Sequence, residues 1–126
     1  MNNENCGDRC AVQVVEAYFQ SHDACHFAIH AEVEDMAQRT LARGRDAIAI
    51  TLRHWYEGDF LDAHDEPRNM IATDDTVIAE WNFHGRRYAG TTHMEPVVIA
   101  VIAVFEVANG QIQRARWYYD PTTLRR

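Results

Sequence analysis

The longest apolar stretch of the chain, residues 97–105, reads VVIAVIAVF without a polar side chain. Strands that lack polar alternation in this way are typically covered on both faces. The pair Asn109-Gly110 follows closely and is a strong signal for a tight β-hairpin. Ile112–Tyr119 then returns as the last strand. The end of the chain therefore predicts an antiparallel sheet with one deeply buried strand.

A further hairpin is predicted before the apolar run. Strand-like sequence begins at Asn69, and apolar residues alternate with polar ones along residues 77–84. His84–Arg87 supplies the turn, and Tyr88 begins the return strand. The pair Glu95-Pro96 marks a break before the apolar run.

Three helices are predicted ahead of these strands. Ala11–Gln20 carries apolar residues at helical spacing. Residues 23–30 form a short second helix, whose first turn Asp23 caps. After an extended segment at residues 31–36, Gly44 precedes an amphipathic third helix. Its apolar residues fall on one face: Ile48, Leu52, Trp55, Tyr56 and Phe60.

Helices followed by an antiparallel meander are typical of an α+β domain, in which the helices pack on one face of the sheet. No further helix is predicted to cover the other face, which carries Ala100, Ile102 and Val104. An identical subunit is the simplest cover, so we expect a homodimer that forms through the outer sheet face.

Length and charge narrow the class of protein. The 126 residues suit one domain, predicted at 11–126 after a flexible N-terminus at 1–10. A net charge of -7 without a basic run argues against nucleic acid as a partner. The apolar run is about half of what a membrane-spanning helix needs, and the N-terminus lacks the apolar core of a signal peptide. We therefore expect a cytoplasmic protein with no membrane partner.

The order and spacing of short fragments along the chain carry a family resemblance. These fragments are Ser21-His22-Asp23, Glu34-Asp35, Gly44-Arg45-Asp46-Ala47-Ile48, Glu80-Trp81, Gly85, Gly90, Phe105-Glu106, Asn109-Gly110-Gln111-Ile112 and Trp117-Tyr118-Tyr119-Asp120. From roughly residue 11 to the end, the chain resembles the nuclear transport factor 2-like superfamily, and within it the SnoaL-like polyketide cyclases and ketosteroid isomerases. The resemblance implies a cone-shaped fold, with three N-terminal helices packed on a curved, mainly antiparallel sheet that encloses a pocket.

Asp35 is the first catalytic candidate. It lies nine residues before Gly44, a spacing similar to that of the general base in ketosteroid isomerases. An apolar cavity destabilises the charged form of a carboxylate and makes it a better acceptor for a proton from carbon. The alternative is a surface aspartate within the acidic stretch Glu32–Asp35.

Other catalytic positions of these families carry apolar residues in this chain. The second acid of ketosteroid isomerases, and the histidine of some SnoaL-like cyclases, would fall at Ala103. The acid or base on the last strand of the cyclases would fall at Trp117. The arginine and aspartate of limonene epoxide hydrolases would fall at Trp81 and Phe83. We therefore do not expect an epoxide hydrolase.

These replacements predict an apolar wall suited to a planar or polycyclic ligand. Its members are Trp81, Phe83, Ile99, Val101 and Trp117. The alternative is that the same aromatic residues fill a collapsed core.

Hydrogen-bonding help could come from Tyr18, Tyr56, His93 or the indole nitrogen of Trp117. Buried tyrosine hydroxyls need a partner, which a ligand carbonyl or the protein backbone would supply. His93 would shuttle protons or stand as a half-exposed structural residue.

His22, His26 and His30 follow one another in steps of four, so a helix would stack their imidazoles on one face as possible zinc ligands. The predicted helix is short and places no acidic partner beside them. No metal site is predicted.

Two functions follow from these residues. The first is a cofactor-independent isomerase, cyclase or lyase that abstracts a proton next to the carbonyl of a hydrophobic ketone or polyketide-like substrate. Asp35 would be its base, with a tyrosine or histidine as donor. The second is a non-catalytic binding or scaffolding domain of the same fold, for a hydrophobic ligand or a protein partner. The lost polar positions favour this second reading.

Overall fold

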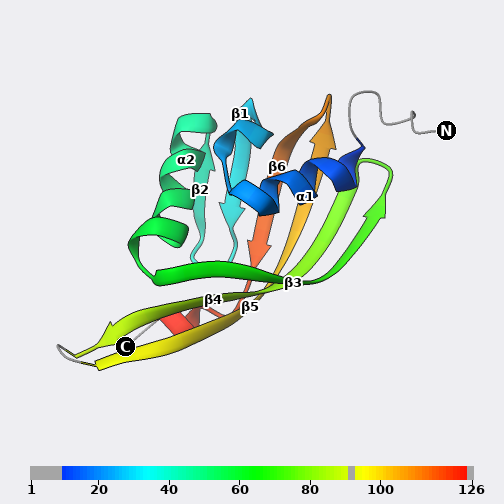
Figure 1. Ribbon diagram of the computed structural model, residues 1–126. Helices are drawn as coiled ribbons and strands as arrows, with labels where there is room; N and C mark the ends of the chain where they lie inside the picture. The colour runs from blue at the N-terminus through cyan, green and yellow to red at the C-terminus, as the bar shows by residue number, and fades with distance from the viewer. Residues whose placement is uncertain (1–9, 91–92, 125–126) are drawn as a thin grey trace.

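The computed structural model describes residues 10–90 and 93–124 of the chain (Figure 1). Most of the predicted flexible N-terminus at 1–10 therefore lies outside the described residues. The elements follow in this order: α1 (Ala11–Ser21), η2 (Ala24–His26), β1 (Phe27–Asp35), β2 (Thr40–Arg43), α2 (Arg45–Arg53), η3 (His54–Gly58), β3 (Leu61–Thr73), β4 (Thr76–Ala89), β5 (His93–Ala108), β6 (Gln111–Tyr118) and η4 (Pro121–Leu124).

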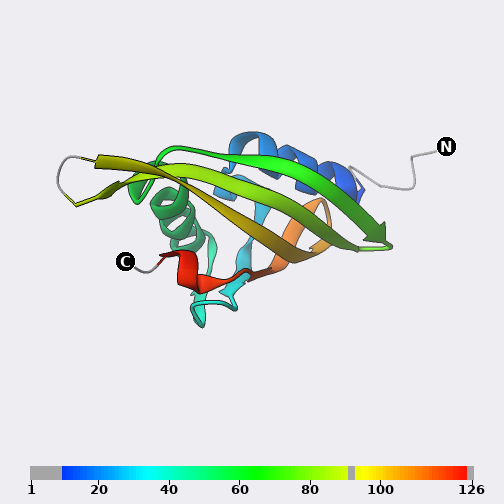
Figure 2. The same ribbon diagram turned by 90° about the horizontal axis from the view of Figure 1, so that it is seen from below.

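The strands of the described residues form one mixed sheet in the order β2-β1-β6-β5-β4-β3. Neighbouring strands are antiparallel except β1 and β6, which run parallel. The sheet is strongly curved, and both α-helices lie on one face of it (Figures 1 and 2). Helix α1 contacts β3 to β6, whereas α2 contacts β1 and β2. The predicted α+β class is confirmed.

The number of helices differs from the prediction. Helix α1 is confirmed, but the helix predicted over residues 23–30 is wrong, and the described residues contain two α-helices instead of three. Only a short 3-10 turn, η2, forms there, and Asp23 caps it as predicted by accepting the backbone N–H of Cys25 at 2.8 Å. From Phe27 onward the backbone pairs with β2 and β6, and this sheet pairing overrides the weak helical pattern.

The third predicted helix is shorter than its amphipathic pattern. Helix α2 begins after Gly44 and ends in η3, a single wide π-helical turn. Ile48 and Leu52 are buried as predicted. Phe60 lies beyond the helical residues, yet its ring stacks on that of Trp55 with 5.9 Å between centroids. The apolar face of the pattern is therefore kept even where the helix has ended.

The hairpin predicted with its turn at His84–Arg87 is wrong in position. β4 runs without interruption through His84–Arg87, and it pairs with β3, a strand that begins well before Asn69. The turn between β3 and β4 lies at Asp74-Asp75 instead. Gly85 has a packing role, because a Cβ atom there would lie only 2.8 Å from the Cβ of Phe60. The sequence predicts a turn at Gly85, whereas in the structure this glycine makes room for Phe60.

The predicted break at Glu95-Pro96 is also wrong, because β5 continues through it and Pro96 pairs with Arg86 of β4. β6 pairs with β5 only between Ile102 and Ala108. Beside Pro96, β5 therefore has no ladder partner on its second side, which is where a sheet tolerates the missing N–H of proline. Here β4 and β5 extend as a ribbon beyond the other strands (Figure 1).

The hairpin at Asn109-Gly110 is confirmed. Both residues have left-handed backbone angles, φ 55° and 73°, as a tight hairpin turn with glycine requires. The apolar run before it is buried on its inner face, at Val97, Ile99, Val101, Ala103 and Phe105. On the outer face of this single chain, Val98 and Ile102 are exposed.

Candidate functional site

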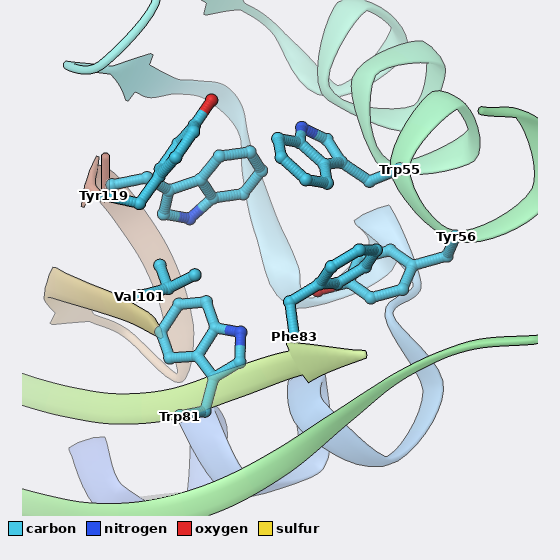
Figure 3. Close-up of a pocket in the computed structure, with 7 residues that line it drawn as sticks. Trp55, Tyr56, Trp81, Phe83, Val101 and Tyr119 are labelled. Carbon is cyan, nitrogen blue, oxygen red and sulfur yellow. The ribbon is translucent and has the colours of Figure 1, made fainter. Parts of the chain in front are cut away.

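An aromatic pocket lies between the inner face of the sheet and the end of α2 (Figure 3). Its cavity volume is only about 20 Å3, room for about one water molecule and far below the range of about 300–1,000 Å3 that is usual for small-molecule sites. The aromatic rings therefore nearly fill the space, as the alternative of a collapsed core predicts, and an organic ligand would enter only if the rings moved apart. The lining residues come from five segments: Trp55 and Tyr56 of η3, Trp81 and Phe83 of β4, Val101 of β5, Trp117 of β6, and Tyr119 just after it.

Trp55 joins the helical and sheet sides of this pocket. Its ring meets those of Phe83, Trp117 and Tyr119 nearly at right angles, with centroid distances of 5.1, 6.4 and 5.6 Å. Edge-to-face contacts of this kind are favourable because the positive edge of one ring meets the negative face of another. The wall is thus a packed aromatic cluster with fixed ring orientations.

The structure brings four of the five predicted wall residues into this pocket, namely Trp81, Phe83, Val101 and Trp117. Ile99 is buried in the core on the same strand as Val101 but does not line the pocket. Trp55 and Tyr119, which were not among the predicted wall residues, complete the lining. Ala103, at the position of the second acid in ketosteroid isomerases, is fully buried.

Asp35 lies at the end of β1 with only 4% of its surface exposed. Its Oδ2 accepts the hydroxyl of Tyr119 at 2.5 Å and the side-chain amide of Gln38 at 3.3 Å. Its Oδ1 accepts the backbone N–H of Gln38 at 2.9 Å. A carboxylate offers about four lone-pair positions, so these three donors leave room for one more. Asp35 is thus coupled to the aromatic pocket through Tyr119, whose ring lines it.

A second, more open hollow adjoins the aromatic pocket and is bordered by Asp35 itself. Trp55 belongs to the lining of both, so the two spaces meet at its ring. The second hollow also has cationic and carboxylate side chains at its border, including Arg87 and Asp59. Arg87 in turn donates to the backbone oxygens of Thr123 and Leu124. The C-terminal turn η4 is thereby held beside the hollow.

A polar cluster that the sequence did not predict lies around Asp65 of β3. The hydroxyl of Tyr56 donates to Asp65 Oδ2 at 2.7 Å, and Nε2 of His22 lies 2.8 Å from the same oxygen. The rings of His22 and Tyr56 are stacked, with 3.8 Å between centroids. The side chain of Asp65 is almost fully buried, and its Oδ1 has no hydrogen-bond partner among the described residues. A second buried carboxylate therefore stands behind a tyrosine of the pocket wall.

The tyrosines beside these two carboxylates hold their protons strongly. Burial raises the pKa of Tyr18, and the nearby charge of Asp65 raises it further. Burial likewise raises the pKa of Tyr56, with added effects of Tyr18 and Asp65. Burial and the hydrogen bond to Asp35 raise the pKa of Tyr119. At neutral pH these three side chains are therefore neutral hydroxyl groups.

Of the four predicted donors, Trp117 lines the aromatic pocket, and the other three lie in different places. Tyr56 lines the aromatic pocket, but its hydroxyl is engaged with Asp65. Tyr18 belongs to α1, and its side chain is buried against the sheet side of the helix. It does not line the pocket, and its hydroxyl has no hydrogen-bond partner among the described residues. His93 is exposed at the start of β5, opposite Ala89, and also lies outside the pocket lining.

The structure does not bring His22, His26 and His30 together. His22 lies at the end of α1, His26 hydrogen bonds with Ser21 in η2, and His30 belongs to β1. Within residues 10–90 and 93–124, no group of three potential metal ligands comes together. In the same part of the chain, no helix has the length and apolar character of a membrane span.

Comparisons with known proteins agree with this architecture. A structure of ketosteroid isomerase-like fold from Catenulispora acidiphila, solved in complex with trimethylamine, matches with a TM-score of 0.77 and 16% identity over 88% of both chains. A protein named as a SnoaL-like polyketide cyclase from Shewanella denitrificans matches with a TM-score of 0.76 and 16% identity, over 90% of this chain and 93% of that one.

A protein from M. tuberculosis, named as an LEH-like epoxide hydrolase, matches with a TM-score of 0.70 and 20% identity, over 90% of this chain and 84% of that one. At such identities these structures establish the fold alone. No match is found among curated proteins.

The sequence itself matches the family model of the SnoaL-like domain over residues 15–115. The predicted resemblance to the nuclear transport factor 2-like superfamily is thereby confirmed. Because the match spans most of the sequence, this chain belongs to the SnoaL-like domain family.

Proposed function

We propose that this chain is a cofactor-independent enzyme that abstracts a proton next to the carbonyl of a small hydrophobic ketone. Asp35 is the proposed base, and the aromatic pocket holds the rings of the substrate. The reaction would be an isomerisation, a cyclisation or an elimination, as the isomerase and cyclase names within this fold suggest.

The observation that carries this proposal is the coupling of Asp35 to the pocket wall. The carboxylate is buried, keeps one lone-pair position free, and is hydrogen bonded to Tyr119, whose ring lines the pocket. A ligand with its ring beside Trp55 would have its edge at the hollow that Asp35 borders. Proton transfer from carbon needs this closeness more than any other property of the base.

The pocket's size favours a small substrate. The cavity of about 20 Å3 must widen to take any ligand, and the flat rings of Trp81 and Phe83 would then suit a compact planar molecule. The similar structure from Catenulispora acidiphila was solved with trimethylamine, also a small molecule. Even a compact ring would require the packed rings around Trp55 to move apart, and a large polyketide would require a much larger movement.

Exchange of deuterium into a simple ketone tests the base without knowledge of the natural substrate. We use 1-indanone in heavy water and follow the loss of the proton signal next to the carbonyl by NMR. The wild-type protein is expected to accelerate the exchange, and Asp35→Asn to reduce that acceleration by about 10²–10⁴-fold, the usual contribution of a general base.

Asp59→Asn is the matched control, because Asp59 is the other carboxylate that borders the same hollow. It is expected to exchange at the wild-type rate. Circular dichroism checks that Asp35→Asn is folded, since asparagine can still accept the N–H of Gln38. Full exchange by a folded Asp35→Asn protein would refute the role of Asp35.

The second candidate is a binding domain without catalysis. Its support is that Trp81, Phe83, Ala103 and Trp117 stand where polar catalytic groups stand in the families named above. Binding of 1-indanone to the wild-type protein without any acceleration of exchange would favour this second function.

A further inference from the structure

Two buried donors in the wall of the aromatic pocket have no acceptor. Trp81 and Trp117 are only 4% and 5% exposed, and neither indole nitrogen has a hydrogen-bond partner among the described residues. An indole N–H can donate but cannot accept, and burying it unpaired costs free energy. Native proteins rarely leave such groups unpaired, so each one needs an explanation.

The sheet register places the two indoles on the same face of the sheet, on the two strands that flank β5. Trp81 of β4 pairs with Val101 of β5, and Trp117 of β6 pairs with Ala103, two residues further along the same strand. Both side chains stand on the inner face, on opposite sides of β5, and both line the same pocket. Figure 3 shows the indole nitrogen of Trp81 on the Tyr56 side of its ring.

The hydroxyl groups of the pocket wall are committed elsewhere. The hydroxyl of Tyr56 donates to Asp65, and that of Tyr119 donates to Asp35 and accepts from Gln38. In Figure 3 the Tyr119 hydroxyl points away from Val101 and Trp81. Neither tyrosine hydroxyl therefore accepts a hydrogen bond from the indole N–H groups, and neither has a free proton to donate to a ligand.

We infer that the indole N–H groups of Trp81 and Trp117 bind the acceptor oxygen of the ligand, and that they select planar molecules that carry a carbonyl group. This inference rests on the proposed function. Of the predicted donors it keeps the indole nitrogen of Trp117, adds that of Trp81, and sets aside Tyr18, Tyr56 and His93. It also explains why aromatic residues at these positions are compatible with carbonyl chemistry.

The same donors would serve during proton transfer. When Asp35 takes the proton from the carbon beside the carbonyl, the C–H electron pair forms a C=C bond, and the π pair of the carbonyl moves to its oxygen. The indole N–H groups then donate to this enolate oxygen, and Asp35 returns the proton to carbon. Hydrogen bonds to a developing oxyanion strengthen as the charge grows.

The experiment compares 1-indanone with indane, which has the same two rings but no carbonyl. The three tryptophans of the chain give three indole signals in an ¹⁵N–¹H spectrum, and single Trp→Phe variants assign them. With 1-indanone, the indole protons of Trp81 and Trp117 are expected to move downfield, as hydrogen-bonded protons do. With indane they are expected to show no such displacement.

Variants test the same point through affinity. In Trp81→Phe and in Trp117→Phe, the ratio of 1-indanone affinity to indane affinity is expected to fall about tenfold, the value of one buried hydrogen bond. Phe83→Leu is the control, because it trims the same wall without removing a donor, and should keep the wild-type ratio.

The outcomes separate this inference from the proposed function. An unchanged ratio in both tryptophan variants, or indole protons that do not respond to 1-indanone, would overturn the inference while the pocket still binds both ligands. Failure of the wild-type protein to bind either ligand would overturn the pocket as well. Loss of exchange in Asp35→Asn with normal indole shifts would support both.

Discussion

Tyr18, Tyr56 and Tyr119 keep their protons because burial makes the tyrosinate form costly. Unfolded chains ionise tyrosine near pH ~10. Below that pH these tyrosines are protonated in both the folded and the unfolded state, so they do not make the free energy of unfolding depend on pH. Above it the unfolded state loses protons that the folded state retains, so the free energy of unfolding should decrease as the pH rises beyond about 10.

An alkaline titration measures this effect. Tyrosinate absorbance and circular dichroism are followed on the same samples, and part of the absorbance rise should coincide with the loss of secondary structure. Complete ionisation of all five tyrosines while the circular dichroism stays native would contradict the burial of these hydroxyls.

The two buried carboxylates show what a sequence can and cannot reveal about single residues. Asp35 was found by its spacing, and its burial agrees with a place at the pocket's edge. Its partner Tyr119 lies far along the chain and arrives through the parallel pairing of β1 with β6, where Asp35 pairs with Trp117. Asp65 was missed because the early part of β3 has no clean alternation.

Gly85 of β4 packs against Phe60, which lies between η3 and β3. Because a Cβ atom there would lie 2.8 Å from the Cβ of Phe60, one of the two backbones must shift to accept Gly85→Ala. We expect this variant to lose about 1–3 kcal/mol of stability, the usual cost of overpacking a core. Denaturant unfolding followed by tryptophan fluorescence gives the free energy of unfolding.

Gly58→Ala is the comparison, since a Cβ atom there would have the Arg53 carbonyl oxygen as its nearest neighbour, at 3.4 Å. It is expected to change the free energy of unfolding by less than about 1 kcal/mol. Equal stabilities of the two alanine variants would mean that Gly85 does not act as a spacer for Phe60.

Local signals predicted the elements that local chemistry determines. Helix α1 and the Asn109-Gly110 hairpin depend on spacing and on left-handed turn residues, and both are confirmed. The sequence near Gly85 and Pro96 contains the same kinds of signal, but there the glycine serves packing and the proline stands beside a missing ladder partner. Such roles depend on distant strands and cannot be read from neighbouring residues.

The outer face of the sheet carries exposed apolar side chains that no element of the described chain covers. Its exposed apolar side chains belong to adjacent strands: Ile78 of β4, Val98 and Ile102 of β5, and Tyr118 of β6. Contiguous apolar surface of this kind usually marks an interaction site. Two ion pairs lie beside it, Arg116 with Glu106 and Arg114 with Glu34, and Glu80 stands opposite Ile102.

An apolar face of this kind can pack against a copy of itself, and we propose that two chains form the expected homodimer through it. Sedimentation should therefore give the mass of two chains. Ile102→Lys places a charge at the centre of this face, opposite Glu80 on the neighbouring strand, so the fold can accept it. The expected result is a folded monomer, because the added ammonium group and the carboxylate of Glu80 would both lose their water in each half of the interface. Ile50→Lys changes an equally exposed isoleucine on α2, away from the sheet, and should remain a dimer. A wild-type mass of one chain would exclude self-association and would leave the apolar face to a different partner.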